Sequence, residues 1–206
     1  MTTWVIVPVK PLDQGKSRLR ALFSADELLQ FNISLFQSTY FKLKDSPEID
    51  RILVVSRDQQ VLEWVTSWGG VSLPEKGPAG LNAAIAQGFA FILAEEPGPV
   101  LILPTDLPLM MAEDLRLIFS FAPQDPGALI VPDHRQAGTN ALCLSRPDLL
   151  PPSFGLNSFH AHCALAEAMH LSLVVYLNRH IQHDIDTPED LEAIRENDLV
   201  NPISPT

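Results

Sequence analysis

Short apolar runs alternate with longer stretches of helical spacing along nearly the whole chain. Runs of four to six apolar residues are typical of buried strands, and apolar positions that recur every three or four residues are typical of amphipathic helices. This alternation predicts an α/β fold with a mostly parallel central sheet and helices on both faces. The predicted strands are Trp4 to Val9, Ile52 to Ser56, Val71 to Leu73, Val100 to Pro104, Ala128 to Pro132, Ala141 to Ser145 and Leu173 to Leu177. The predicted helices are Ala25 to Leu43, Gln59 to Trp68, Leu81 to Ala94, Ala112 to Phe121, Ser158 to His170 and Pro188 to Glu196.

Two helix starts carry a local chemical signal. Ser24 and Glu27 have the spacing of a capping box, and Thr187 stands as an N-cap before Pro188, whose φ suits a first helical residue. The final stretch "NDLVNPISPT", residues 197–206, is typical of a flexible tail. We expect one domain over residues 1–206 with its core over about residues 3–196.

Composition narrows the classes of partner. A chain of 206 residues with 46% hydrophobic residues suits an ordinary globular fold, and its net charge of −11 argues against a nucleic-acid groove. It has no apolar run of the roughly 20 residues that cross a bilayer, and "MTTWVIVPVK" lacks the features of a signal peptide, so a cytoplasmic protein without a membrane partner is expected. Cys143 and Cys163 stand alone and are expected to be buried small hydrophobes.

One loop reverses the overall acidic character. Residues 10 to 20 contain Lys10, Lys16, Arg18 and Arg20 against Asp13 alone. Such a local concentration of positive charge in an acidic protein indicates an anionic partner, the alternative being a solvated basic face without function.

The same loop includes Gly-Lys-Ser, the end of a P-loop signature. That signature requires another glycine five residues before the Gly-Lys pair, where this chain has Lys10. Pro8 and Pro11 also remove two N–H donors, so the loop cannot form the phosphate-binding nest of a P-loop.

Two acidic motifs indicate a magnesium site. "VLILPTDLPL" carries an apolar strand directly into Asp106, and "HDIDTPEDL" places Asp184 and Asp186 two residues apart, on one face of a short predicted strand. Mg²⁺ takes one or two protein carboxylates and completes its shell with water and phosphate oxygens. Capping of the next turn by Asp106, or of the next helix by Asp186, remains the alternative.

Six motifs together resemble the 2-phospho-L-lactate guanylyltransferase family of coenzyme F420 biosynthesis. They are "VPVKPLDQGKSRL", "EKGPAGLNAAI", "PTDLPL", "GTNAL", "FGLNSFHAH" and "DIDTPEDL", in this order over about residues 3 to 196. "DLPL" and "DTPEDL" occur widely among nucleotidyltransferases, whereas "GTNAL" with "FGLNSFHAH" is more specific. The resemblance implies a Rossmann-like nucleotidyltransferase fold, Mg²⁺ as cofactor, and transfer of GMP from GTP to the phosphate of a small acid with release of pyrophosphate. Because the acceptor phosphate is largely dianionic at pH 7, no general base is required.

The resemblance also assigns roles to particular residues. The glycine-rich opening loop of sugar nucleotidyltransferases is reduced here to Gly15, a departure from that wider group. Catalytic roles fall to Lys16, Arg18 and Asp106, and metal binding falls to Asp106, Asp186 and Asp184. Nucleotide binding falls to Lys10, Gly15, Lys16, Arg18, Glu75, Gly77, Gly80 and Asn82. The donor and acceptor pattern of guanine suits the carboxylate of Glu75.

The acceptor pocket is implied at Thr139, Asn140, Gly155 and Ser158. Ser158 stands at a helix start, where free N–H groups favour anions and where simple N-capping is the alternative. The acceptor stays open among 2-phospholactate, phosphoenolpyruvate and 3-phosphoglycerate. His160 and His162 are two apart, which on a helix points them in different directions and argues against zinc, although His160 could touch the acceptor phosphate.

Two alternatives to the guanylyltransferase remain at this point. One is a related transferase for a cytidylyl group or the molybdenum cofactor, and the other is a nucleotide-binding regulator without catalysis. A homodimer is compatible with the family resemblance.

Overall fold

The strands form one seven-stranded sheet at the centre of the molecule. The computed structural model describes residues 1–122 and 126–196. The strand order is β3-β2-β1-β4-β6-β5-β7, and among these strands β6 alone runs antiparallel to its neighbours. The strands are β1 Trp4–Val9, β2 Arg51–Ser56, β3 Val71–Pro74, β4 Val100–Ile102, β5 Gly127–Pro132, β6 Thr139–Leu144 and β7 Ser172–Val175.

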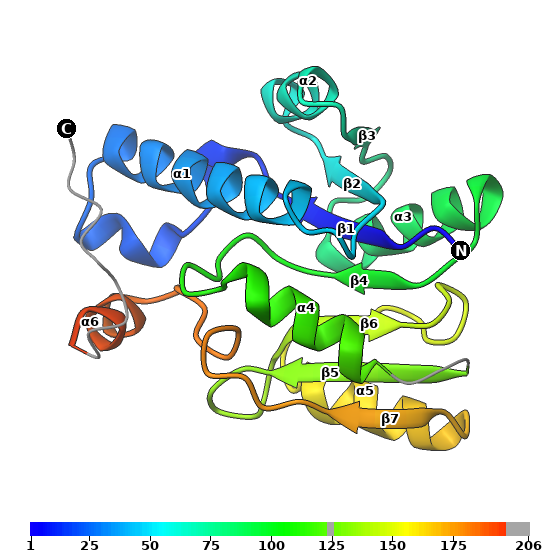
Figure 1. Cartoon of the computed structure of the whole chain (residues 1–206). Helices are drawn as coiled ribbons and strands as arrows, with labels where there is room; N and C mark the ends of the chain where they lie inside the picture. Colours follow the sequence, from blue (N-terminus) through cyan, green and yellow to red (C-terminus); the bar gives the residue numbers. More distant parts are fainter. Residues whose placement is uncertain (123–125, 197–206) are drawn as a thin grey trace.

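Helices cover both faces of this sheet, as the alternating pattern predicts. Figure 1 shows α1 and α4 on the near face, and α3 and α5 on the far face. The α-helices are α1 Ala25–Lys44, α2 Gln59–Ser67, α3 Leu81–Glu95, α4 Ala112–Phe121, α5 Ser158–Ala168 and α6 Pro188–Glu196. Two short 3₁₀ helices, η1 Leu12–Gln14 and η2 Ser17–Ala21, follow β1.

The predicted elements therefore exist with boundaries shifted by a few residues. β4 stops at Ile102, before the predicted end at Pro104, since proline has no N–H for the ladder. The short strand predicted around Asp184 and Asp186 is wrong, because that segment forms no strand. The predicted flexible tail, residues 197–206, lies outside the described residues.

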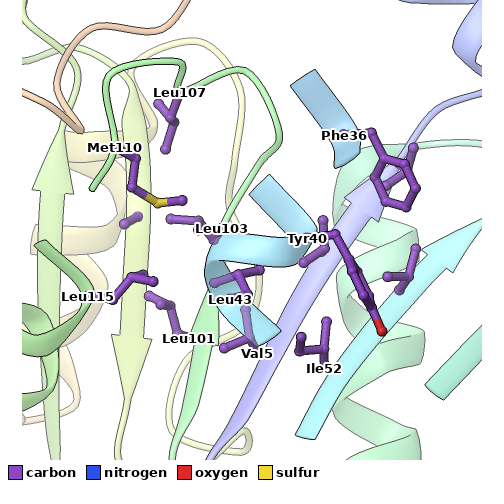
Figure 2. Close-up of a cluster of buried hydrophobic side chains, with 14 of the residues drawn as sticks. Val5, Phe36, Tyr40, Leu43, Ile52, Leu101, Leu103, Leu107, Met110 and Leu115 are labelled. Carbon is purple, nitrogen blue, oxygen red and sulfur yellow. The ribbon is translucent and has the colours of Figure 1, made fainter. Parts of the chain in front are cut away.

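Each face of the sheet has its own hydrophobic core. The near face packs against α1, α2 and α4, and Figure 2 shows Phe36, Tyr40 and Leu43 of α1 beside apolar strand residues. The far face packs Trp4, Ile6 and other strand residues against α3 and α5. Cys143 is buried in the near core as expected, and burial raises the pKa of its thiol to about 12, which keeps it protonated. Cys163 is only partly buried.

A third, smaller cluster lies at the edge where the parallel strands end. It consists of Leu19, Leu28, Leu109, Ile185, Leu191 and Ile194. These residues come from η2, α1, the loop after β4, the segment that enters α6, and α6 itself. The cluster therefore joins the basic loop to both acidic motifs.

The direction of β6 decides what else reaches this edge. Since β6 is antiparallel, its first residues, Thr139 and Asn140, lie where the other strands end. Ligands of open α/β sheets bind beyond the carboxyl ends of the strands.

No helix in the described ranges is long and apolar enough to span a membrane.

Candidate active site

Three carboxylates meet at the carboxyl edge of the sheet. Oxygen atoms of Asp106, Asp184 and Asp186 all lie within 4.8 Å of one another. The backbone N–H of Ile185 donates to the carbonyl of Asp106 (3.0 Å), while the Ile185 side chain is buried in the third cluster. One buried residue and one backbone hydrogen bond therefore hold the two acidic motifs together without a strand.

Lys16 lies between two of these carboxylates. Its Nζ is 2.7 Å from Asp106 Oδ2 and 2.8 Å from Asp186 Oδ1, and its side chain is 10% exposed. Burial disfavours the charged ammonium, but attraction to Asp106 and Asp186 outweighs this, so the pKa of Lys16 is raised above 10.5. The ammonium is therefore permanently charged at neutral pH.

The backbone at Lys16 has an unusual conformation, with a positive φ. Lys16 has φ 51° and ψ 39°, in the left-handed region that costs a non-glycine residue free energy. The preceding Gly15 has an ordinary φ of −70°, but a Cβ there would lie 2.8 Å from Asn32 Nδ2. Asn32 is buried and donates to the carbonyl of Leu12 (2.8 Å). Gly15 thus allows the loop to lie close to Asn32, and its assignment to nucleotide binding stays a prediction.

Asp184 is a partly buried member of the acidic cluster. Burial raises its pKa, the nearby charge of Asp106 raises it further, and a hydrogen bond from Asn140 Nδ2 (3.1 Å) opposes the shift. Three carboxylates beside one ammonium, which pairs with only two of them, leave negative charge that a cation would relieve. Their hard oxygen atoms suit Mg²⁺, so the residues present fit this ion. Asp186 is not the N-cap of α6 that the alternative required, since Thr187 caps α6 by accepting from the Asp190 N–H (3.3 Å).

A β-bulge places Asn140 beside Asp184. The pairing passes from Val131 with Ala141 to Pro132 with Thr139, so Asn140 is the extra residue on β6. Besides Asp184, its amide donates to the carbonyl of Ile181 (2.9 Å). Asn140, predicted in the acceptor pocket, here supports the segment that carries the acidic residues.

Thr139, Gly155 and Ser158 lie around the start of α5. Ser158 is 2% exposed, and Asn157 rather than Ser158 is the N-cap residue, with φ 56° and no side-chain cap. Within residues 1–122 and 126–196 no hydrogen bond of the Ser158 hydroxyl is present. Gly155 has φ 129°, which favours glycine. The Phe159 N–H donates to the Ala137 carbonyl (3.0 Å), which ties α5 to the loop before Thr139.

The loop after β3 is held by its own side chains. Glu75 Oε1 accepts from the Gly80 N–H (3.0 Å), and the Glu75 carboxylate pairs with Arg57 (3.3 Å), which also donates to the Gly77 carbonyl. Gly77 has φ 72°. Gln87 holds the backbone of Lys76 from both sides, accepting at 2.8 Å and donating at 3.1 Å. The Glu75 carboxylate therefore already has two partners, Gly80 and Arg57. Its recognition of guanine stays a prediction.

Asn82 connects two parts of the candidate site. Its Nδ2 donates to the Phe154 carbonyl (2.9 Å), and its Oδ1 accepts from the Phe154 N–H (2.8 Å). Asn82 is the second residue of α3 and belongs to the predicted nucleotide side, and Phe154 directly precedes Gly155 of the predicted acceptor pocket. Both the Nδ2 and the Oδ1 of Asn82 thus form hydrogen bonds within the protein.

The remaining basic residues point to solvent. Lys10, Arg18 and Arg20 are exposed, and no ion pair of theirs occurs in the described part of the chain. Arg57 and His162 lie in this region but are not among the site residues predicted from the sequence. Arg57 follows β2 directly, so its place at the carboxyl edge is the signal that could have marked it.

Comparison with known proteins identifies relatives over most of the chain. The family profile described as "Guanylyl transferase CofC like" matches residues 3–196. A phosphoenolpyruvate guanylyltransferase of Rubrobacter xylanophilus is 37% identical over 94% of each chain, and one of Sphaerobacter thermophilus is 34% identical over 94% of this chain and 93% of its own. A 2-phospho-L-lactate guanylyltransferase of Methanothermobacter thermautotrophicus is 32% identical over 94% of this chain and 84% of its own.

Solved structures show the same fold at low identity. A nucleotidyl transferase from Methanothermobacter superposes with a TM-score of 0.65 at 16% identity, covering 96% of this chain and 97% of that one. A CMP:2-keto-3-deoxy-manno-octonic acid synthetase complexed with CTP gives 0.63 at 14% identity, covering 96% and 98%. The Rossmann-like nucleotidyltransferase fold expected from the sequence is therefore confirmed.

Proposed function

Because this chain belongs to the CofC-like guanylyl transferase family, we propose that it transfers GMP from GTP to the phosphate of a small phosphorylated carboxylic acid. An oxygen of the acceptor phosphate forms a bond to the α-phosphorus of GTP. The bond from that phosphorus to the bridging oxygen breaks, and pyrophosphate leaves with the electron pair. The acceptor phosphate, with a second pKa near 6, needs no base to become a nucleophile.

The observation that carries this proposal is the acidic cluster around Lys16 at the carboxyl edge. Asp106, Asp184 and Asp186 would hold Mg²⁺, which neutralises triphosphate charge when bound. Lys16 supplies a fixed positive charge beside the same carboxylates. We assign it to the leaving pyrophosphate, because charge builds up there in the transition state.

The exposed cations extend the same charged surface. Lys10 and Arg18 lie on the loop that presents Lys16 and are free of ion pairs in the described residues. We assign both to the triphosphate, as the family resemblance implies. The residues at the start of α5, with Thr139, form the acceptor side.

The acceptor we favour is phosphoenolpyruvate. Relatives that carry this name are 31% to 37% identical to the chain, and those named for 2-phospho-L-lactate are 30% to 32% identical, so the highest identities belong to the former. 3-Phosphoglycerate remains the third acid to be compared. The described pocket residues bear hydroxyl and backbone groups, which suit a compact acid rather than a sugar.

The test is pyrophosphate release with each NTP and each acceptor in the presence of Mg²⁺. We expect turnover with GTP and one of the three acids, and none with hexose 1-phosphates. Turnover with CTP instead of GTP would indicate a cytidylyltransferase. Nucleotide binding without pyrophosphate release from any acceptor would indicate a regulator.

A further inference from the structure

His162 is a fully buried polar side chain at the acceptor side. It has no exposed surface and lies on α5, one turn after Ser158, so the two side chains share a face of that helix. The Phe154 ring packs edge-on against its ring at 4.9 Å. The two hydrogen bonds between the Asn82 amide and the Phe154 backbone hold the Phe154 ring in this position.

Both ring nitrogens of His162 have a partner. Nε2 lies 3.2 Å from the backbone N of Ser153, and Nδ1 lies 3.0 Å from Thr139 Oγ1. A backbone N–H can only donate, so Nε2 must be the unprotonated acceptor. A neutral imidazole then carries its hydrogen on Nδ1.

Burial keeps this imidazole neutral. It lowers the pKa of His162 to about 4, so the ring holds one hydrogen at pH 7. The Nδ1–H group therefore donates to Thr139 Oγ1.

The direction of this hydrogen bond determines what Thr139 can offer. A hydroxyl that accepts from His162 keeps its own hydrogen for another acceptor. In the described ranges, His162 is the only hydrogen-bond partner of the Thr139 hydroxyl, and Thr139 is 8% exposed at the first position of β6. Its remaining hydrogen is thus available to an acceptor from outside the protein.

We propose that His162 is a positioning residue that holds the Thr139 hydroxyl as a hydrogen-bond donor to an anionic group of the acceptor acid. This inference rests on the proposed function for the identity of the acid. The hydrogen bonds of His162 go to Thr139 and Ser153, so it acts on the acid through the Thr139 hydroxyl.

The first test needs no substrate. In ¹⁵N NMR of the folded full-length protein, His162 is expected as the neutral Nδ1–H tautomer at pH 7. The Nε2–H tautomer or a charged ring would reverse the donor direction and overturn the proposal. Because this result is independent of turnover, it separates the inference from the proposed function, which fails by itself if no acid supports pyrophosphate release.

The second test compares Michaelis constants for the acid, measured with phosphoenolpyruvate, and for GTP. His162→Leu and Thr139→Val should each raise the acceptor KM about tenfold, a typical loss for a hydrogen bond to a charged group, and leave the GTP KM within about twofold. The double variant should be no worse than Thr139→Val, because His162 acts through Thr139. His162→Gln, whose amide can donate to Thr139 and accept from Ser153, should restore most of the affinity.

Two outcomes of the second test would contradict the positioning role. Additive increases in the double variant would show that His162 acts independently of Thr139. Parallel increases in both Michaelis constants would show that the ring only supports the fold. If His162→Leu does not fold, the acceptor KM of His162→Gln and of Thr139→Val still tests the proposal. A His162→Gln variant whose acceptor KM is as high as that of Thr139→Val contradicts it.

Discussion

Asp106 is the residue on which both the ion pair and the proposed magnesium site depend. Asp106→Asn removes the charge that attracts Lys16 and Mg²⁺ but keeps the shape of the side chain. We expect the variant to fold and turnover to fall by at least about 100-fold, because charge neutralisation at the triphosphate dominates this chemistry. Pyrophosphate release at saturating GTP and Mg²⁺ measures the loss.

Asp26→Asn provides the matched control for this change. Asp26 is an exposed acid in the first turn of α1, so its amide variant should keep wild-type turnover. Asp186→Asn should resemble Asp106→Asn, and Asp184→Asn should be equal or milder. An Asp106→Asn protein that melts early yet stays active would assign the residue a structural role.

Lys16 and Arg20 allow a second comparison within one loop. Lys16→Ala removes an ammonium held by two carboxylates, whereas Arg20→Ala removes an exposed guanidinium. We expect a rise in GTP KM and a fall in kcat of at least about tenfold for Lys16→Ala, since charge lost at the leaving group affects the transition state most. Arg18→Ala should act in the same direction, and Arg20→Ala should stay within about twofold. Steady-state kinetics that gave equal losses for all three would show a general field rather than contacts.

At the scale of elements, Asp114 joins α4 to the segment that leads to the acidic cluster. It is 3% exposed and accepts from the Met111 N–H (2.7 Å), from Asn178 Nδ2 (2.8 Å) and at 3.0 Å from the His180 ring. Asn178 in turn accepts from the Ile181 N–H (3.0 Å). These bonds fix the path of the chain between β7 and Asp184.

Asp114→Ala should therefore lower the free energy of unfolding by about 3 kcal/mol, because buried donors lose their acceptor. Its neighbour Glu113 is an exposed partner of Arg116, so Glu113→Ala should leave the free energy of unfolding nearly unchanged. Urea unfolding of the two variants checks the contrast. Equal stabilities would mean that the segment between β7 and Asp184 is held by other contacts.

At the scale of the whole molecule, His162 makes stability depend on acid pH. Its pKa is about 4 in the fold, against 6.5 for an unperturbed histidine. Below pH 6.5 the unfolded chain binds a proton that the folded protein does not, so stability falls as pH drops from about 6.5 to about 4 and loses about 2 to 3 kcal/mol through this group. Denaturant midpoints measured across this range test the slope.

His162→Gln should flatten that pH dependence, since an amide does not titrate. His160→Gln is the control, because His160 is two residues away on the same helix but exposed. If both variants keep the wild-type slope, other groups cause the acid sensitivity.

Local signals in the sequence account for the elements. Ser24 accepts from the Glu27 N–H (3.3 Å), and the Ser24 N–H donates to the Glu27 carboxylate (2.8 Å), as the predicted capping box requires. Residues three apart on a helix start can find each other without help from the rest of the chain. The same holds for Thr187 and Asp190 at the start of α6.

Contacts between residues far apart in the sequence were harder to predict from the sequence than these local ones. The acidic motifs indicated a shared site, but the pairing of Asp106 and Asp186 with Lys16 spans 90 and 170 residues of sequence. The partners of Glu75 and Asn82 likewise come from other elements, so the sequence could not show that both side chains are engaged inside the protein.

The amino-acid sequence by itself determined the strands, the helices, the mostly parallel sheet and the family, because these depend on periodicity, on neighbouring residues and on motifs in a fixed order. Tertiary structure alone decided that β6 is antiparallel, that a bulge carries Asn140 to Asp184, and that His162 reaches Thr139. The physical reason is the range of the interactions. Caps and apolar spacing act within a few residues, whereas the direction of a hydrogen bond between a ring nitrogen and a hydroxyl depends on every other partner that folding brings to that ring.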